Sequence, residues 1–223
     1  MRRLTLTLGA AGLLTALCVT PALAAQSNTY AVKAKVTPAK GGTKAKPAPV
    51  GVKFGFNVNE AAGQQPAAVK KYSIGFAGLK PNAKLAAKKG AVIGKGKIIN
   101  YVYLSADPSG NGGFDCVKDL TILSAGKGKA TLNLTGPASA CGGVGNLPPI
   151  PAKFVPFAGG GTALQFELHP TIMHPITGLT VAVRSVDSTL KRGVLTPSRA
   201  KKHKVAATFV TEDGQSTTVR TTA

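Results

Sequence analysis

Residues 50–58 read VGVKFGFNV, and every second residue of this stretch is apolar. Glycine, Lys53 and Asn57 occupy the positions between. Strict alternation over nine residues is typical of a β-strand that buries one face and exposes the other. The stretch therefore predicts a half-buried strand, and it is the clearest structural signal in the chain.

Similar alternation recurs through the rest of the sequence, in patterns too short to indicate a helix. Patterns of this kind lie at 30–36, 72–76, 164–168 and 179–183, and further strands are expected at 92–104, 117–124, 129–135, 152–157, 204–211 and 216–222. The total is about ten strands.

Turn residues indicate how two pairs of these strands are joined. Gly126-Lys127-Gly128 and Asp213-Gly214 each stand between two predicted strands, as in β-hairpins. Such connections favour an all-β fold, and we expect an antiparallel β-sandwich with Greek-key or jelly-roll-like connections.

Composition agrees with this fold class. Of 223 residues, 43% are hydrophobic, 27 are glycine, 15 are proline and none is tryptophan. This hydrophobic content is enough for a folded core, while the glycine and proline content suits a loop-rich β protein better than a helical bundle.

The N-terminus resembles a secretory signal peptide. Arg2 and Arg3 precede an apolar stretch at 4–20, and Ala22-Leu23-Ala24 offers a cleavage site. We expect residues 1–24 to be removed and 25–223 to form a single secreted domain, extracellular or associated with the cell surface. No later segment has the roughly 18 continuous apolar residues of a membrane-spanning helix.

The cysteines fit an oxidising compartment. Cys18 lies within the signal segment, which leaves Cys116 and Cys141 as a pair. Because these two flank a predicted hairpin, an antiparallel pairing would bring them to the same end of the ribbon, and we expect a disulfide. Two free thiols are the alternative.

Charge gives the main functional indication. The chain has 28 Lys and Arg against 8 Asp and Glu, a formal net charge of +20. Residues 29–97 contain 14 lysines and one acid, Glu60. Five lysines of this region fall on the polar positions of their strands and would share the outer face of one sheet: Lys33, Lys35, Lys53, Lys95 and Lys97.

A basic face of this kind attracts polyanions. Outside a cell these include anionic cell-wall and extracellular polymers, which we expect as partners. Specific nucleic-acid recognition is not expected, because the chain has few arginines after residue 24 and its aromatic residues fall on core positions. Alternatively, the lysines only keep a β protein soluble and discourage edge pairing.

The chain also resembles a group of exported, β-rich proteins of high-GC Gram-positive bacteria that has no assigned activity. The resemblance rests on YAVKAKVTPAKGGTKAKPAPVGVKF, GQQPAAVKKYSIGF, SADPSGNGGFDC and ATFVTEDGQSTTV, and covers most of residues 25–223. It implies export and a β fold. The group often carries extra cysteines where this chain reads LAAKKGAVIGKG and TPSRAKKHK, so the disulfides they would form are absent here.

One loop partly matches a calcium-binding spacing. Asp107, Ser109, Asn111 and Asp115 stand at positions 1, 3, 5 and 9, with Gly112 at position 6. Position 12, which should be a bidentate acid, is Lys118. A polar turn is therefore favoured, and no cofactor is predicted.

Two of the three histidines are candidate metal ligands. His169 and His174 lie in HPTIMHP with Met173, a ligand set that copper can use, although exposed loop histidines are common. His203 lies among lysines and is expected in a solvated basic turn.

We find no catalytic motif and expect a protein that is not an enzyme. The alternative is a secreted hydrolase or a metal-dependent carbohydrate-binding accessory protein that uses the 105–115 loop or His169 and His174. A cleft that unites these loops with acidic side chains would favour it.

Overall fold

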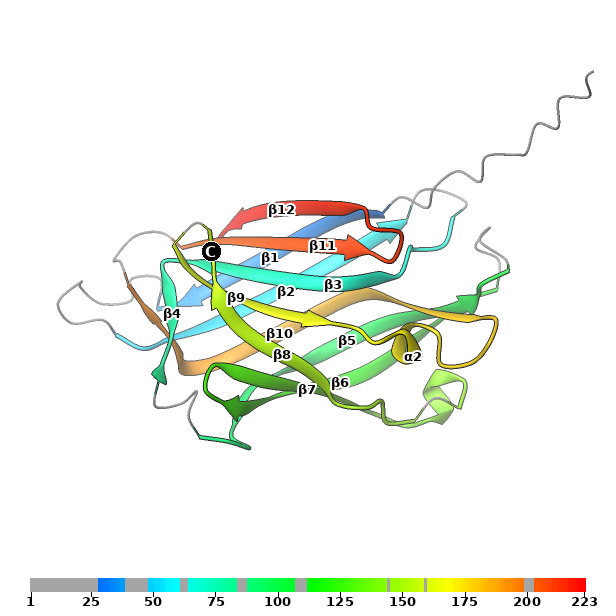
Figure 1. Ribbon diagram of the computed structural model, residues 1–223, viewed down its shortest axis with the longest axis horizontal. Coiled ribbons are helices and arrows are strands. Elements are labelled where there is room, and N and C mark those ends of the chain that lie inside the picture. The colour runs from blue at the N-terminus through cyan, green and yellow to red at the C-terminus, as the bar shows by residue number, and fades with distance from the viewer. Residues whose placement is uncertain are drawn as a thin grey trace, which may run out of the picture.

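A computed structural model describes residues 28–38, 48–60, 64–83, 88–106, 112–143, 145–158, 160–198 and 203–223. The predicted signal peptide, 1–24, lies outside these residues. The described chain is an antiparallel all-β structure with two short helical turns (Figure 1). Its elements are β1 (Asn28–Thr37), β2 (Val50–Glu60), β3 (Val69–Ala77), β4 (Leu79–Pro81), β5 (Val92–Leu104), β6 (Phe114–Gly126), β7 (Lys129–Thr135), η1 (Ser139–Cys141), β8 (Ile150–Pro156), β9 (Gly161–Glu167), α2 (Pro170–Met173), β10 (Leu179–Pro197), β11 (Lys204–Thr211) and β12 (Ser216–Thr222).

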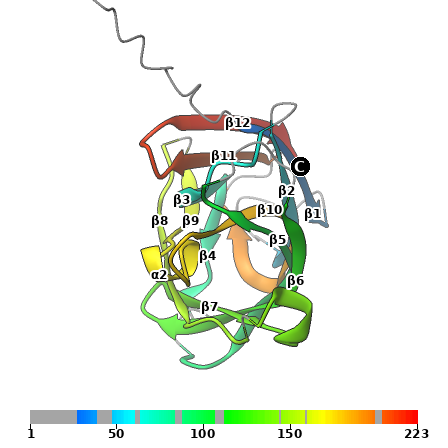
Figure 2. The ribbon, with the colours of Figure 1, turned by 90° about the vertical axis from the view of Figure 1, so that its right-hand side faces the viewer.

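The described strands form one sheet rather than the two stacked sheets of the expected sandwich. Their order is β1-β2-β10-β5-β6-β7-β8-β9-β3-β11-β12, with β4 paired to β10. Viewed end-on, the sheet curls until β1 lies beside β12, which leaves a nearly closed barrel (Figure 2). The all-β, antiparallel prediction is thus confirmed. Two details are corrected: the described strands form one sheet instead of two, and they number twelve instead of about ten.

Both predicted hairpins are present. β6 and β7 join through Lys127, whose φ of 49° is unusual for a residue with a side chain and is flanked by Gly126 and Gly128. β11 and β12 join through Asp213 and Gly214. Glycine adopts positive φ without steric cost, as Gly126, Gly128 and Gly214 do here. These glycines therefore marked both turns in the sequence.

The strand β10 is much longer than its predicted part, 179–183. It runs through Pro197 and pairs with β2 and β5 along its length, and with β4 near its end. The register of β10 against β5 shifts between Val183 and Ser185. Because this bulge interrupts the alternation, the sequence pattern loses its period although the strand continues.

Alternate side chains of nearly every strand fill the barrel with an apolar core. Aromatic rings from different strands pack against one another in and beside this core, where Tyr30 stacks on Phe209 with ring centres 4.1 Å apart and Tyr72 stacks on Phe166 at 4.7 Å. A small interior cavity of about 40 Å³ remains among apolar side chains and Asn100. The core therefore leaves little free space within the barrel.

The predicted disulfide between Cys116 and Cys141 is present and closes one end of the barrel. Lys118, two residues further along β6, points into the same end and is only 1% exposed. Its ammonium donates hydrogen bonds to the carbonyl oxygens of Gly145 (2.8 Å) and Gly136 (3.5 Å). A covalent bond and a buried cation together hold the β7–β8 connection over the core.

None of the helices in the described part of the chain has the length and apolar character needed to cross a membrane.

Candidate polyanion-binding face

The five lysines of the predicted basic surface lie on three strands within a run of four adjacent strands of the sheet, β1-β2-β10-β5. Lys33 and Lys35 belong to β1, Lys53 to β2, and Lys95 and Lys97 to β5. All five are exposed, and β10 separates β2 from β5. We call these five residues the lysine face.

Strand register arranges the lysine face in two rows. In one row, Lys35 pairs with Lys53, Lys53 with Thr189, and Thr189 with Lys95. In the other row, Lys33 pairs with Gly55, Gly55 with Asp187, and Asp187 with Lys97. Adjacent strands are about 4.8 Å apart and alternate residues along a strand about 7 Å apart, so the rows form a lattice of positive charge.

Acidic side chains interrupt and bound this lattice. The Lys53 ammonium lies 3.1 Å from Asp187, in a pair whose side chains are 60% and 65% exposed. Asp119 on β6 stands opposite Lys97 and ends the row there. An ion pair this exposed is worth little in water, so it does not commit Lys53 to Asp187.

A shallow groove of about 400 Å³ runs along β1, β2 and β10 within the lysine face. Lys33, Lys35, Lys53 and Asp187 line it. Gly55, between them, brings no side chain into the groove, and a Cβ there would lie 2.6 Å from the Val186 carbonyl oxygen. The lysine side chains therefore surround a stretch of bare backbone at Gly55, which an extended polymer can approach.

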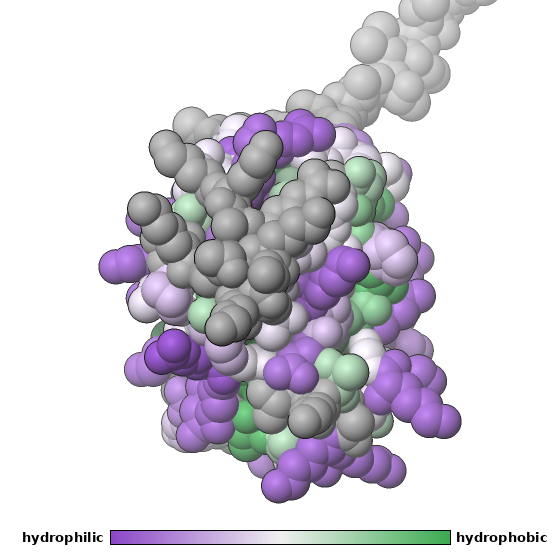
Figure 3. Space-filling model, turned by 90° about the vertical axis from the view of Figure 1, so that its left-hand side faces the viewer, coloured by the Kyte–Doolittle hydropathy of each residue, from purple (hydrophilic) through white to green (hydrophobic). Residues whose placement is uncertain are grey.

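Hydrophilic side chains also surround one end of the barrel. Figure 3 shows this end, the left-hand side of Figure 1, where purple side chains project around the rim and hydrophobic areas between them are small. The visible part of this end has the character of a solvated surface.

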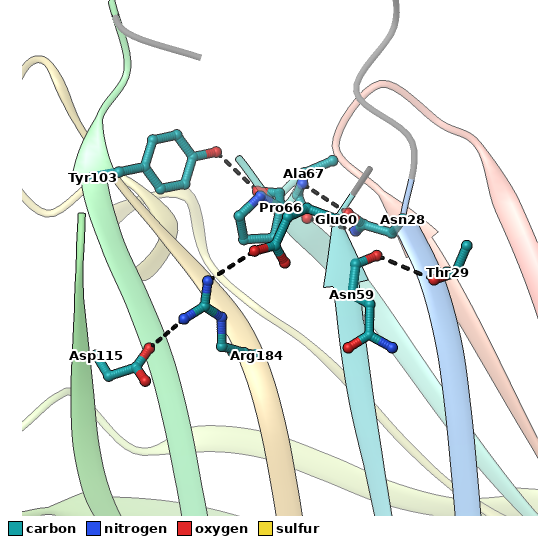
Figure 4. Close-up of polar contacts among 9 residues, drawn as sticks. All are labelled: Asn28, Thr29, Asn59, Glu60, Pro66, Ala67, Tyr103, Asp115 and Arg184. Atoms are coloured by element: carbon teal, nitrogen blue, oxygen red, sulfur yellow. Dashed lines mark hydrogen bonds and ion pairs between the residues drawn. The ribbon is translucent and has the colours of Figure 1, made fainter. Parts of the chain in front are cut away.

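A polar cluster lies where β2 ends and β6 begins, and it contains Arg184 of β10. Its guanidinium donates hydrogen bonds of 2.9 Å to Glu60 and to Asp115 (Figure 4). Because two acids face one arginine, this cluster adds no net positive charge to the lysine face.

The calcium-loop residues are not brought together as a site in the described part of the chain. Asp107, Ser109 and Asn111 lie outside the described residues. Asp115 is paired with Arg184, and Lys118 is buried inside the barrel. Among the described residues, no group of three or more His, Cys, Asp or Glu side chains is placed to hold a metal ion.

The three histidines have separate environments. His169 contacts Thr171, with Nδ1 2.9 Å from the hydroxyl, while His174 Nε2 lies 2.8 Å from a carboxylate oxygen of Glu212. His203 was expected in solvent but is 2% exposed, with Nδ1 3.3 Å from the Ala77 carbonyl oxygen. The lysines next to His203 in the sequence suggested an exposed turn, whereas the folded chain buries this imidazole.

Sequence reasoning found one cluster only in part, since it named the 105–115 loop and His174 but neither Thr180 nor Glu212. Ser105, Thr180, His174 and Glu212 line a single surface pocket, although they are spread over more than a hundred residues of sequence. No catalytic motif contains them, so only the folded chain shows that they meet.

Searches against protein-family models, curated proteins and solved structures find no match to the chain.

Proposed function

We propose that the protein binds anionic polymers of the cell envelope or the extracellular matrix through the lysine face. The observation that carries the proposal is the register of β1, β2, β10 and β5, which aligns five exposed lysines in two rows. Within these rows Asp187 is the one acid, so the rows carry five positive charges against one negative charge.

The spacing of the rows suits a linear polyanion. Charges that repeat every 5–7 Å along a polymer can meet lysines on adjacent strands or at alternate positions of one strand, about 4.8 and 7 Å apart. Each contact is weak and screened by salt, but a polymer makes several at once. Polymer length should therefore raise the affinity strongly.

The chemistry of the face favours charge over sequence recognition. Lysine acts as a point charge, whereas the arginine fork reads phosphate and guanine by paired hydrogen bonds. Arg184 is held by Glu60 and Asp115, and Phe54 and Phe56 are buried in the core. We therefore expect binding that depends on charge density and is indifferent to base sequence.

The test is sedimentation of the purified protein with isolated cell envelope, and binding to polyphosphate as a defined polymer, across a salt series. Binding should fall steeply with salt. The variant Lys35→Gln/Lys53→Gln/Lys95→Gln should reduce the slope of log K against log salt by about 2–3, since each lost phosphate contact removes somewhat less than one unit.

A matched control removes the same charge elsewhere. Lys129, Lys153 and Lys204 are exposed lysines outside the lysine face, and Lys129→Gln/Lys153→Gln/Lys204→Gln should keep most of the binding. Equal losses in the two triple variants would show that net charge alone acts. No binding at low salt would overturn the proposal and leave the lysines as a device for solubility.

A further inference from the structure

Four polar side chains form a continuous hydrogen-bonded chain at the end of the barrel that carries α2. Ser105 Oγ lies 2.6 Å from Thr180 Oγ1, and Thr180 Oγ1 lies 3.5 Å from Nδ1 of His174. On the other side of the imidazole, His174 Nε2 lies 2.8 Å from a carboxylate oxygen of Glu212. A hydroxyl pair, a base and an acid are thus connected in series.

The acceptor and donor roles along this chain fit one arrangement of protons. The Glu212 carboxylate can only accept, so a neutral His174 carries its proton on Nε2 and leaves Nδ1 as an acceptor. Thr180 then donates to Nδ1, and Ser105 donates to Thr180. A proton released from Ser105 consequently has a path to the imidazole.

The backbone around the chain is fixed. Ser105 N–H donates to the Gly178 carbonyl oxygen at 2.8 Å, and Glu212 N–H donates to that of Ala68 at 3.0 Å. Thr180 is buried, whereas Ser105 is exposed. These contacts hold the reactive groups in place while leaving the outermost hydroxyl accessible.

The chain lines a surface pocket of about 390 Å³. Ala67, Ala68, Tyr103 and Asp213 form the rest of the lining. The two alanines give the pocket an apolar part that would accept a short acyl group. The pocket is large enough for a small ester and too small to enclose a polymer.

We propose that Ser105 is a nucleophile that cleaves small carboxylic esters at this pocket. Ser105 Oγ forms a bond to the ester carbonyl carbon, its proton passes to Thr180 Oγ1, and the Thr180 proton passes to His174 Nδ1. The bond to the alcohol oxygen then breaks, and the alcohol leaves with the proton returned along the same path.

A water molecule completes the reaction. It attacks the acyl–Ser105 ester, gives a proton to the same relay, and releases the carboxylic acid with the serine hydroxyl restored. Ser105 reacts with the substrate, His174 is the base, and Glu212 is a positioning residue that holds the imidazole tautomer. This site does not depend on the lysine face, which lies on other parts of the sheet.

The test uses a fluorophosphonate probe, which reacts with activated serines, and p-nitrophenyl acetate as a small ester. The purified protein should form a single covalent adduct, located at Ser105 by peptide mass analysis, and should hydrolyse the ester. Ser105→Ala should abolish both. Ser105 is exposed, so this variant should keep its thermal midpoint.

Variants of the relay distinguish proton transfer from a structural role. His174→Gln and Thr180→Val should each slow labelling by about 10²-fold or more, the usual contribution of a general base. Thr180→Ser, which keeps the hydroxyl, should restore labelling to within a few-fold. His169→Gln changes the other histidine of the same loop, lies outside the pocket, and should have no effect.

The proposal is wrong if the probe fails to label the protein under conditions that label a known serine hydrolase. It is also wrong if Ser105→Ala labels as fast as the unmodified chain. Equal labelling of Thr180→Val and Thr180→Ser would overturn the relay through Thr180.

Discussion

The guanidinium carbon of Arg184 lies 3.9 Å from the centre of the Tyr101 ring. The same guanidinium donates to Glu60 of β2 and Asp115 of β6, so one side chain of β10 ties together four neighbouring strands. Tyr101 is 8% exposed although it lies on the outer side of the barrel, next to Tyr103. Arg184 therefore covers aromatic surface that would otherwise contact water.

Replacing Arg184 with alanine should lower the free energy of unfolding by about 1–2 kcal/mol. The cation–π contact and the lost packing over Tyr101 contribute most, because the partly exposed ion pairs are screened by solvent. The urea midpoint of purified variants measures the effect. Arg184→Lys should recover less than half of it, since lysine lacks the planar fork.

The exposed Arg220 of β12 provides the control for this substitution. Arg220→Ala should change the free energy of unfolding by no more than about 0.5 kcal/mol. Equal effects of the two substitutions would show that the contacts of Arg184 contribute nothing beyond its charge.

Lys118→Met should destabilise the end of the barrel that the disulfide closes. The carbonyl oxygen of Gly145 loses a donor at 2.8 Å, and a buried acceptor left without a partner costs about 1–3 kcal/mol. Urea unfolding of the two proteins gives the difference at neutral pH. A more stable variant would mean that burial of the ammonium outweighs its hydrogen bonds.

The same lysine predicts a pH dependence. Burial lowers the pKa of Lys118 from its usual 10.5, so the unfolded chain holds this proton at pH values where the folded chain has released it. Between the folded pKa and 10.5 the contribution of Lys118 to stability should therefore rise with pH. Stability of the unmodified protein minus that of Lys118→Met, measured from pH 7 to 10.5, should increase; a fall would contradict the lowered pKa.

Local pattern predicted the strands well because alternation and turn residues act over a few positions. VGVKFGFNV lies within β2, and Asp213-Gly214 joins β11 to β12. The register bulge of β10 after Val183 and the three-residue β4 were missed, since neither has a period to detect. Closure of the sheet was missed too, because it depends on β1 meeting β12 from opposite ends of the chain.

The site residues show the same difference between what a local pattern indicates and what only the folded chain brings together. The lysine face could be predicted because Lys33, Lys35, Lys53, Lys95 and Lys97 each occupy the outer position of a strand, although only the structure gives the strand order that aligns them. In the cluster from Ser105 to Glu212, the sequence singled out His174 and the loop that begins at Ser105, but it did not indicate Thr180 or Glu212, because β10 and the β11–β12 turn reach this pocket only in the folded chain. His203 was assigned to solvent from its lysine neighbours, whereas its side chain faces inward.

Removing the disulfide should lower stability without abolishing the β6–β7 hairpin. Cys116 and Cys141 enclose a separation of 25 residues, for which loop entropy predicts a loss of about 3.5 kcal/mol. The comparison is the urea midpoint of the oxidised protein against Cys116→Ser/Cys141→Ser. An unchanged midpoint would indicate that Lys118 and the core alone hold the connection closed.

Gly96→Ala tests the close approach of β5 and β10 between the two rows of lysines. A Cβ at Gly96 would lie 2.2 Å from the Asp187 carbonyl oxygen and 2.7 Å from the Ser188 Cα, both rigid backbone atoms of β10. One of the two strands must therefore move, and we expect a loss of about 1–3 kcal/mol in the free energy of unfolding.

Gly51→Ala is the matched control, because a Cβ there meets its nearest atom, the Leu190 carbonyl oxygen, at an ordinary 3.6 Å. Its effect should be within about 0.5 kcal/mol, or slightly stabilising as the unfolded chain loses freedom. Urea midpoints of both variants decide the matter. If Gly96→Ala unfolds at the same midpoint as Gly51→Ala, β5 and β10 lie farther apart at Gly96 than the structure has them, and the two rows of lysines lack the spacing on which the proposed polymer binding rests.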